Sequence, residues 1–338
     1  MNHLLMIGMN FHTYEDEIVR CLGDLGFFVD KITDQPKRSH GYGLIPAKLR
    51  EQDSIQFQKK QLQKLNKSYD IVLVFVGRFL HKFFLEELRK KNPNAKFILY
   101  LWDDLARVEN YYEVKDCYDE IITFELKDAL KLNLRFIPLY YMPDYCVQNN
   151  NKLYDICTVS SEHSDRIEIM RSLIQANTDG MLFNFRIFAL WKSYIKYILS
   201  GKKKNDESNG LFYTTKSATI PETARLMSES RAILDIQHFT QKGLTNRTLE
   251  ALGAKIKLVT TNEEVQYYDF YNPKNIYIMD RNNPQLDIGF LRSTYEEVPK
   301  DIYEKYSLRA WLEDILFNTK QYYLNIGWEE AKKLLIKD

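Results

Sequence analysis

The chain has 338 residues, a length that allows two domains that each bury their own core. Hydrophobic residues make up 45% of the sequence and charged residues 28%, a balance that excludes wholesale disorder. The formal net charge is only +1, so the molecule as a whole has no charge that would attract nucleic acid, and we expect no such partner. Any anion site must therefore be local.

The amino-terminal sequence MNHLLMIGMNF has no basic region and no long apolar stretch, so it is not typical of a signal peptide. The most apolar run, Ile71–Gly77, has the length of a strand, far below the roughly 20 residues that span a bilayer. The four cysteines include no CxxC pair, which favours a reducing compartment. We expect a cytoplasmic protein that stays in solution or works at the inner face of the membrane.

The first part of the chain alternates short β-forming runs with helical patterns. The expected strands are LLMIG at 4–8, FFVDKIT at 27–33, IVLVFVG at 71–77, FILYLW at 97–102, EIITF at 120–124 and RFIPLYY at 135–141. Because these strands are apolar throughout and helices separate them, they predict a parallel sheet covered on both faces.

The pattern restarts after a polar stretch at 148–152, which is typical of a linker. The second series comprises DICTVSS at 155–161, a helix at 167–173, MLFNFRIF at 181–188, GLFYTT at 210–215, RAILDIQ at 231–237, KIKLVTT at 255–261 and NIYIMD at 275–280. The sequence therefore predicts an α/β protein with two Rossmann-like, doubly wound domains facing across a cleft. We expect these domains at 1–147 and 153–315. A helical segment would follow at 316–338, and it could cross back to the first domain.

Ligands of such sheets bind beyond the carboxyl ends of the strands, so the loops there matter most. The most informative stretch runs from Asp235 to Asn262. It predicts a strand, a polar loop containing Gly243, and a helix that begins near Thr245 or Asn246, both of them good capping residues. Gly253 then ends the helix, and another strand follows.

Three polar residues of this helix share one face, because Asn246 and Arg247 precede Glu250 by four and three positions. The free N–H groups at a helix start favour a diphosphate, and Arg247 could add a bidentate contact. Glu250 could accept hydrogen bonds from ribose hydroxyls. Alternatively, Arg247 and Glu250 pair with each other on a solvated surface, and their spacing does not decide between the two interpretations.

The segment GLTNRTLEALGAKIKLVTTN at 243–262 resembles the nucleotide-sugar segment of GT-B glycosyltransferases, in which a helix carries an E-A-x-G/A core. With FILYLWDD, FIPLYYMPD and SSEHSDR, nearly the whole chain resembles a bacterial group that assembles lipopolysaccharide or capsule. The resemblance implies a transferase that uses a nucleotide sugar as its substrate, with no separate cofactor. Its acceptor would be a glycan or a lipid-linked oligosaccharide of the cell surface.

The sequence departs from this pattern at one position. Many retaining GT-B enzymes carry a glutamate eight residues before the position of Glu250, where this chain has Lys242. Whether the enzyme would invert or retain the sugar configuration is therefore open. Lys242 could face the diphosphate, or it could simply be a solvated loop residue.

Polar residues after the first and fourth strands are candidates for the acceptor side. Asn10 and His12 follow the first strand, and the resemblance implies that a histidine there acts as the general base of inverting members. After the fourth strand, Asp103 could be the base instead, and Trp102 could stack on a sugar. The alternatives are that Trp102 fills the core and an aspartate caps a helix. We assign Asn10 and Trp102 to the acceptor, and Asp103 and His12 compete for the base.

Hydroxyl groups from Ser160 onward follow the first strand of the second domain and could hold donor phosphate, helped by Arg166. The same loop also has the composition of an ordinary helix start. No DxD-type motif stands at the end of an isolated strand. We therefore expect no obligatory metal.

A basic, aromatic segment at 185–204 combines Trp191 with lysines. It predicts either peripheral contact with an anionic membrane or a core helix followed by a basic loop.

Two rival functions stay open for the whole chain. One is a GT-B-shaped epimerase or polyol-phosphate transferase, and the other is a non-catalytic, nucleotide-binding scaffold.

Overall fold

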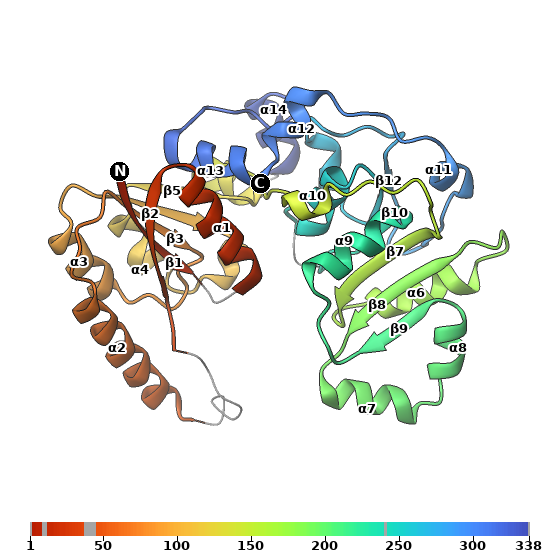
Figure 1. The fold of residues 1–338 in the computed structure, drawn as a ribbon, viewed down its shortest axis with the longest axis horizontal. Helices are drawn as coiled ribbons and strands as arrows, with labels where there is room; N and C mark the ends of the chain where they lie inside the picture. The colour runs from red at the N-terminus through yellow and green to blue at the C-terminus, as the bar shows by residue number, and fades with distance from the viewer. Residues whose placement is uncertain (1, 9–11, 37–44, 240–241, 337–338) are drawn as a thin grey trace. The chain divides into compact units, whose positions relative to one another are not determined.

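The structure is a computed structural model that describes residues 2–8, 12–36, 45–239 and 242–336. It divides into two compact units, one comprising residues 1–137 with Leu335–Asp338, the other Pro138–Leu334 (Figure 1). The predicted first domain ended at 147, whereas this division assigns residues 138–147 to the second unit.

The predicted strand at 135–141 is largely wrong. Only β6 (Arg135–Phe136) joins the first sheet, and Pro138, which follows closely, has no N–H group to continue a ladder. Tyr141 instead pairs within the second unit: its amide donates to the carbonyl of Tyr306 at 2.9 Å, and its carbonyl accepts from the amide of Leu308 at 3.0 Å.

The first unit contains a sheet of six parallel strands in the order β2-β1-β3-β4-β5-β6. Its other strands are β1 (Asn2–Gly8), β2 (Phe27–Thr33), β3 (Ile71–Phe75), β4 (Lys96–Leu101) and β5 (Glu120–Thr123). The helices around it are α1 (His12–Asp24), α2 (Ala47–Lys64), α3 (Lys82–Lys91), α4 (Tyr111–Val114) and α5 (Leu126–Leu132), with 3-10 turns η2 (Leu105–Arg107) and η3 (Lys115–Cys117).

The second unit contains another six-stranded parallel sheet, in the order β12-β11-β10-β7-β8-β9. Its strands are β7 (Tyr154–Ser161), β8 (Phe183–Phe188), β9 (Leu211–Thr214), β10 (Ser230–Asp235), β11 (Lys257–Thr260) and β12 (Ile276–Ile278). Numbered within the unit, this order is 3-2-1-4-5-6, that of dinucleotide-binding Rossmann domains. Two doubly wound α/β domains were predicted, and the structure confirms them.

Nine helices are described in or beginning in the second unit. They are α6 (Arg166–Gln175), α7 (Trp191–Leu199), α8 (Lys203–Ser208), α9 (Ile220–Ser228), α10 (Asn246–Gly253), α11 (Ile288–Arg292), α12 (Lys300–Lys305), α13 (Leu308–Phe317) and α14 (Trp328–Leu335), with 3-10 turns η4 (Pro143–Tyr145) and η5 (Glu263–Tyr267). Among the described residues, none of the helices is both long and apolar enough to cross a bilayer.

Buried aliphatic strands form the core of each unit, as their continuous apolar sequences predict. In the first sheet, Leu4–Ile7 and Val72–Val74 have no exposed surface. In the second sheet, Ile156 and Ile233 are equally buried. Both faces of each sheet are thus covered.

Close packing also fixes the end of α10. A methyl group at Gly253 would lie 2.7 Å from the Cβ and Cγ atoms of Tyr141, which is too close for either side chain to stay in place. The glycine therefore lets α10 sit directly against the segment that begins the second unit.

We expect Gly253→Ala to lower the free energy of unfolding by about 1–3 kcal/mol, because the added methyl group overpacks this contact. Urea denaturation measures the effect. Gly23→Ala is the matched control: Gly23 is also helical, but an added methyl group meets no atom within 4 Å there. It should leave stability unchanged or raise it by about 0.5–1 kcal/mol. Equal effects of the two substitutions would contradict this account.

Candidate functional site

The two halves of the second sheet meet between β7 and β10. These strands are parallel neighbours, although their first register partners, Tyr154 and Ser230, lie 76 positions apart along the chain. From β7 the chain continues towards β8 on one side, and from β10 it continues towards β11 on the other. The loops after these two strands diverge at this switch point. Such a point is where ligands of open α/β sheets bind.

Arg166 joins these two loops. Its Nε atom donates to the carbonyl of Ile236 at 2.6 Å, and its Nη1 atom donates to the carbonyl of Ser161 at 3.3 Å. Burial lowers the pKa of this guanidinium to about 10, and the positive charges of Arg247 and Arg281 contribute to the decrease. Arg166 nevertheless stays charged at neutral pH.

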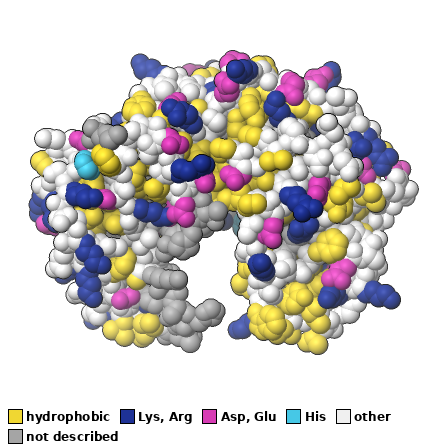
Figure 2. Space-filling view, in the orientation of Figure 1, with side chains coloured by type: hydrophobic (Ala, Val, Ile, Leu, Met, Phe, Trp, Pro, Cys, Tyr) yellow, Lys and Arg dark blue, Asp and Glu magenta, His cyan; other side chains and the backbone are white. Residues whose placement is uncertain are grey.

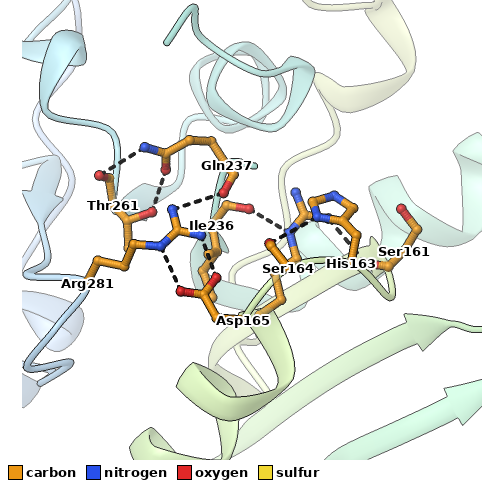
Figure 3. Close-up of polar contacts among 9 residues, drawn as sticks. Ser161, His163, Ser164, Asp165, Ile236, Gln237, Thr261 and Arg281 are labelled. Atoms are coloured by element: carbon orange, nitrogen blue, oxygen red, sulfur yellow. Dashed lines mark hydrogen bonds and ion pairs between the residues drawn. The ribbon is translucent and has the colours of Figure 1, made fainter. Parts of the chain in front are cut away.

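Arg281 extends the connection to two further strands (Figure 3). It follows β12, and its Nε and Nη2 atoms donate to the carboxylate of Asp165 at 2.8 and 2.5 Å. These bonds hold the pKa of Asp165 below its usual value. The Nη1 atom of Arg281 donates to the carbonyl of Gln237 at 3.1 Å, and the Gln237 side chain bonds with Thr261, which follows β11. Loops after four strands are thus linked.

The start of α10 is fixed on the end of β10. Thr245 caps the helix, since its hydroxyl accepts from the amide of Arg247 at 3.1 Å. The hydroxyls of Thr245 and Thr248 donate to the buried Asp235 carboxylate at 2.7 and 2.9 Å. The predicted limits of this helix, from Thr245 or Asn246 to Gly253, are confirmed.

Arg247 and Glu250 form an ion pair, as one interpretation of their spacing predicted. They do not lie on a solvated surface, however, because Glu250 is only 1% exposed. The Nε atom of Arg247 also donates to the carbonyl of Val159 near the end of β7, at 3.0 Å. The pair therefore ties α10 to the switch point.

The remaining predicted donor residues lie in the same region. The side-chain amide of Asn262 donates to the carbonyls of Lys242 and Gly243 at 2.9 and 3.2 Å and so holds the loop before α10. The side chain of Lys242 is exposed. Asn246 is the first residue of α10 and is half-buried. The buried hydroxyl of Ser160 has no hydrogen-bond partner in the described part of the chain.

An aromatic group lies beside these loops, and the sequence analysis missed it. The rings of His163 and His238 are 5.3 Å apart, and His238 stacks on Phe239 with ring centroids at 4.4 Å. Phe239 is 61% exposed, which leaves a ring available for another planar group. Arg281 was also missed, because nothing in the sequence links it to Asp165, which lies 116 residues earlier.

In the first unit, Trp102 packs edge-on against Phe75 and Tyr100, with ring centroids 5.6 and 6.3 Å apart. It contacts the hydrophobic core and is half-buried, an arrangement that the packing alternative predicted. Asp103 forms an ion pair with Arg78 and a longer one, at 3.5 Å, with Arg107.

The other acceptor-side candidates cannot be placed as fully. Asn10 lies outside the described residues, and His12 is the first residue of α1, with its side chain outside the description. Asp34, which follows β2, has no exposed surface, and burial raises its pKa to about 7. That burial keeps Asp34 from contacting a glycan in this structure, so Asp103 and His12 stay the predicted bases.

The sequence matches no protein-family model and no curated protein. Solved structures do match. The apo form of the lipopolysaccharide outer core galactosyltransferase WaaB superposes with a TM-score of 0.54 at 11% identity, over 94% of this chain and 99% of that one. Anabaena Alr3699/HepE in complex with UDP-glucose superposes with a TM-score of 0.55 at 10% identity, over 95% of this chain and 100% of that one.

These structural neighbours are GT-B glycosyltransferases, and they match along nearly their whole length. At 10–11% identity the comparison bears on the fold, and it agrees with the two six-stranded parallel sheets described above. The chain has the two-domain fold of the GT-B glycosyltransferases.

Proposed function

We propose that this chain is a glycosyltransferase that moves a sugar from a nucleotide-sugar donor to a hydroxyl group of a surface-polysaccharide acceptor. The observation that carries the proposal is the cluster of Arg166, Arg247 and Arg281 at the switch point of the second sheet, beside the start of α10. Guanidinium groups and free helix N–H groups are suited to a diphosphate. The UDP-glucose complex of HepE, which shares this fold, supports a nucleotide sugar as the ligand.

Arg166 is the strongest candidate for the phosphate contact. Arg281 is paired with Asp165 and Arg247 with Glu250, whereas both hydrogen bonds of Arg166 go to carbonyl oxygens. Its charge is thus held in place without a carboxylate within ion-pair distance among the described residues. Asp235 attracts this guanidinium from a longer distance, and a diphosphate would add a negative charge in direct contact with it.

The other donor contacts follow from this placement. If Arg247 turns towards the phosphate, Glu250 is released to accept hydrogen bonds from the ribose hydroxyls. Asn246, Thr245 and Gly243 would contribute contacts from the start of α10, together with Ser160 and Lys242. The exposed ring of Phe239 would stack on the base.

On the acceptor side, we propose that Asp103 or His12 removes the proton from the acceptor hydroxyl, with Trp102 and Asn10 contacting the glycan. The hydroxyl oxygen then bonds to the anomeric carbon as the bond from that carbon to the diphosphate oxygen breaks. The nucleoside diphosphate leaves, and the arginine cluster stabilises the negative charge that it gains. Because these cations perform that role, we propose that no metal ion is required.

The acceptor is proposed to be a glycan or lipid-linked oligosaccharide of lipopolysaccharide or capsule, reached from the cytoplasmic face of the membrane. The name of the structural neighbour WaaB, a lipopolysaccharide outer core galactosyltransferase, supports this class of acceptor. The resemblance of the sequence to a bacterial surface-polysaccharide group supports it independently.

We expect Arg166→Gln to weaken nucleoside diphosphate binding by about 10- to 100-fold, the effect of losing a charged hydrogen bond of about 1.5–3 kcal/mol. Calorimetric titration with UDP, GDP and dTDP, and with the matching nucleosides, measures it. The nucleosides should bind equally well to both proteins, since they lack phosphate. Arg309→Gln, an exposed arginine of α13, is the control and should bind like the wild type. An unchanged diphosphate affinity in Arg166→Gln would remove the phosphate site.

A transfer assay separates the candidate bases. The assay follows the release of nucleoside diphosphate from the donor, with cell-envelope glycans as acceptors. It is run with excess chelator, because we expect the wild-type protein to be fully active without a metal ion. Substitution of the true base, by Asp103→Asn or His12→Gln, should lower kcat by about 10²- to 10⁴-fold with little change in the KM for the donor. Epimerisation of the donor without any acceptor, or nucleotide binding without turnover of any donor, would contradict a transferase.

A further inference from the structure

The helix α7 presents its most apolar side chains to solvent. Trp191 is 65% exposed and Leu199 is 80% exposed, and Ile195 and Ile198 are each 40% exposed. Leu190, immediately before the helix, is 71% exposed. An apolar surface of this kind on a single helix usually marks a site of interaction.

The apolar side chains form one stripe. Trp191, Ile195, Ile198 and Leu199 are spaced i, i+4, i+7 and i+8, which places them on one side of the helix. Tyr197 lies on the other side, where it is buried and stacks on Tyr213 of β9 with ring centroids 3.8 Å apart. The helix is therefore attached to the sheet by its tyrosine side, and the stripe faces away from the core.

Positive charge accompanies the stripe. Lys192 and Lys196 lie on α7 beside it, and Lys202–Lys204 follow directly, all of them exposed. Residues 190–204 contain these five lysines and no acidic residue. Figure 2 shows hydrophobic side chains together with lysine or arginine side chains at the lower edge of the second unit, where Figure 1 has α7.

We propose that the surface formed by residues 190–204 binds an anionic membrane, with the apolar stripe in the boundary between headgroups and acyl chains and the lysines against the headgroups. Helices with an apolar side flanked by lysines bind such interfaces, and each lysine near the surface adds attraction to anionic lipid. The long lysine side chains can extend from the edge of the stripe to the headgroups.

The charges favour a membrane over a second copy of the chain. A symmetric dimer through this surface would bring the five lysines of one copy against the same five of the other. No acidic residue within 190–204 would offset that repulsion. An anionic bilayer supplies the opposite charge and covers the apolar side chains at the same time. This inference does not depend on the proposed sugar transfer, because binding is measured without any sugar.

Vesicle flotation tests the charge contribution. The full chain should bind vesicles of phosphatidylcholine mixed with phosphatidylglycerol, should bind pure phosphatidylcholine much less, and should be released by high salt. The triple variant Lys202→Gln, Lys203→Gln, Lys204→Gln should partition about 100-fold less, at about fivefold for each lysine. The control triple variant Lys59→Gln, Lys60→Gln, Lys64→Gln removes the same charge from exposed positions of α2 and should bind like the wild type. Equal losses in the two triple variants would overturn the proposal.

Tryptophan fluorescence tests the apolar contribution. Brominated acyl chains should quench part of the emission, and Trp191→Phe, which keeps an apolar ring, should still bind vesicles but lose that quenching. Trp191→Ser combined with Leu199→Ser should abolish flotation, and a normal melting temperature would show that the variant folds. Quenching that persists in Trp191→Phe would overturn the proposal. So would a wild-type chain that binds no vesicles and forms a dimer that the double serine variant dissociates.

Discussion

A partly buried positive charge at the switch point of the second sheet, that of Arg166, is the constraint on which the site depends. Arg166 bridges the loops after β7 and β10 through two carbonyl groups, and its lowered pKa reflects the cost of keeping that charge buried near Arg247 and Arg281. An anion bound there would relieve this cost. Because the hydrogen bonds to the carbonyls already orient the guanidinium, little reorganisation would accompany binding, as in other preorganised polar sites.

The packing of the second unit keeps this arrangement in place. Asp235 accepts from the hydroxyls at the start of α10, so the end of β10 and the helix that would face the phosphate are joined. At the other end of α10, Gly253 allows close contact with Tyr141.

In the first unit, Val76 has a φ of 61° and Gly77 has a φ of 63°. This unusual turn precedes Arg78, the partner of Asp103.

Local patterns in the sequence predicted much of the fold, while contacts distant in sequence went unpredicted. Apolar strand runs and the capping residue Thr245 correctly indicated the two sheets and α10, because these features depend on neighbouring residues. The spacing of Arg247 and Glu250 could not reveal that the pair is buried, and Arg281 meets Asp165 only through the fold. The segment at 135–141 has the sequence of a strand, but Tyr141 pairs with Tyr306 and Leu308, which are distant in the sequence. Likewise, only the structure showed which side of α7 faces solvent.

Hydrogen–deuterium exchange with and without UDP tests the central claim most directly, because it reports where the diphosphate binds without assuming any activity. We predict slower amide exchange in residues 159–166 and 243–248 when UDP is added, and little change when uridine is added. Both segments lie at the switch point and include Arg166 and the first turn of α10. Exchange that is unchanged in these two segments, or that is slowed only in other segments of the chain, would contradict the account.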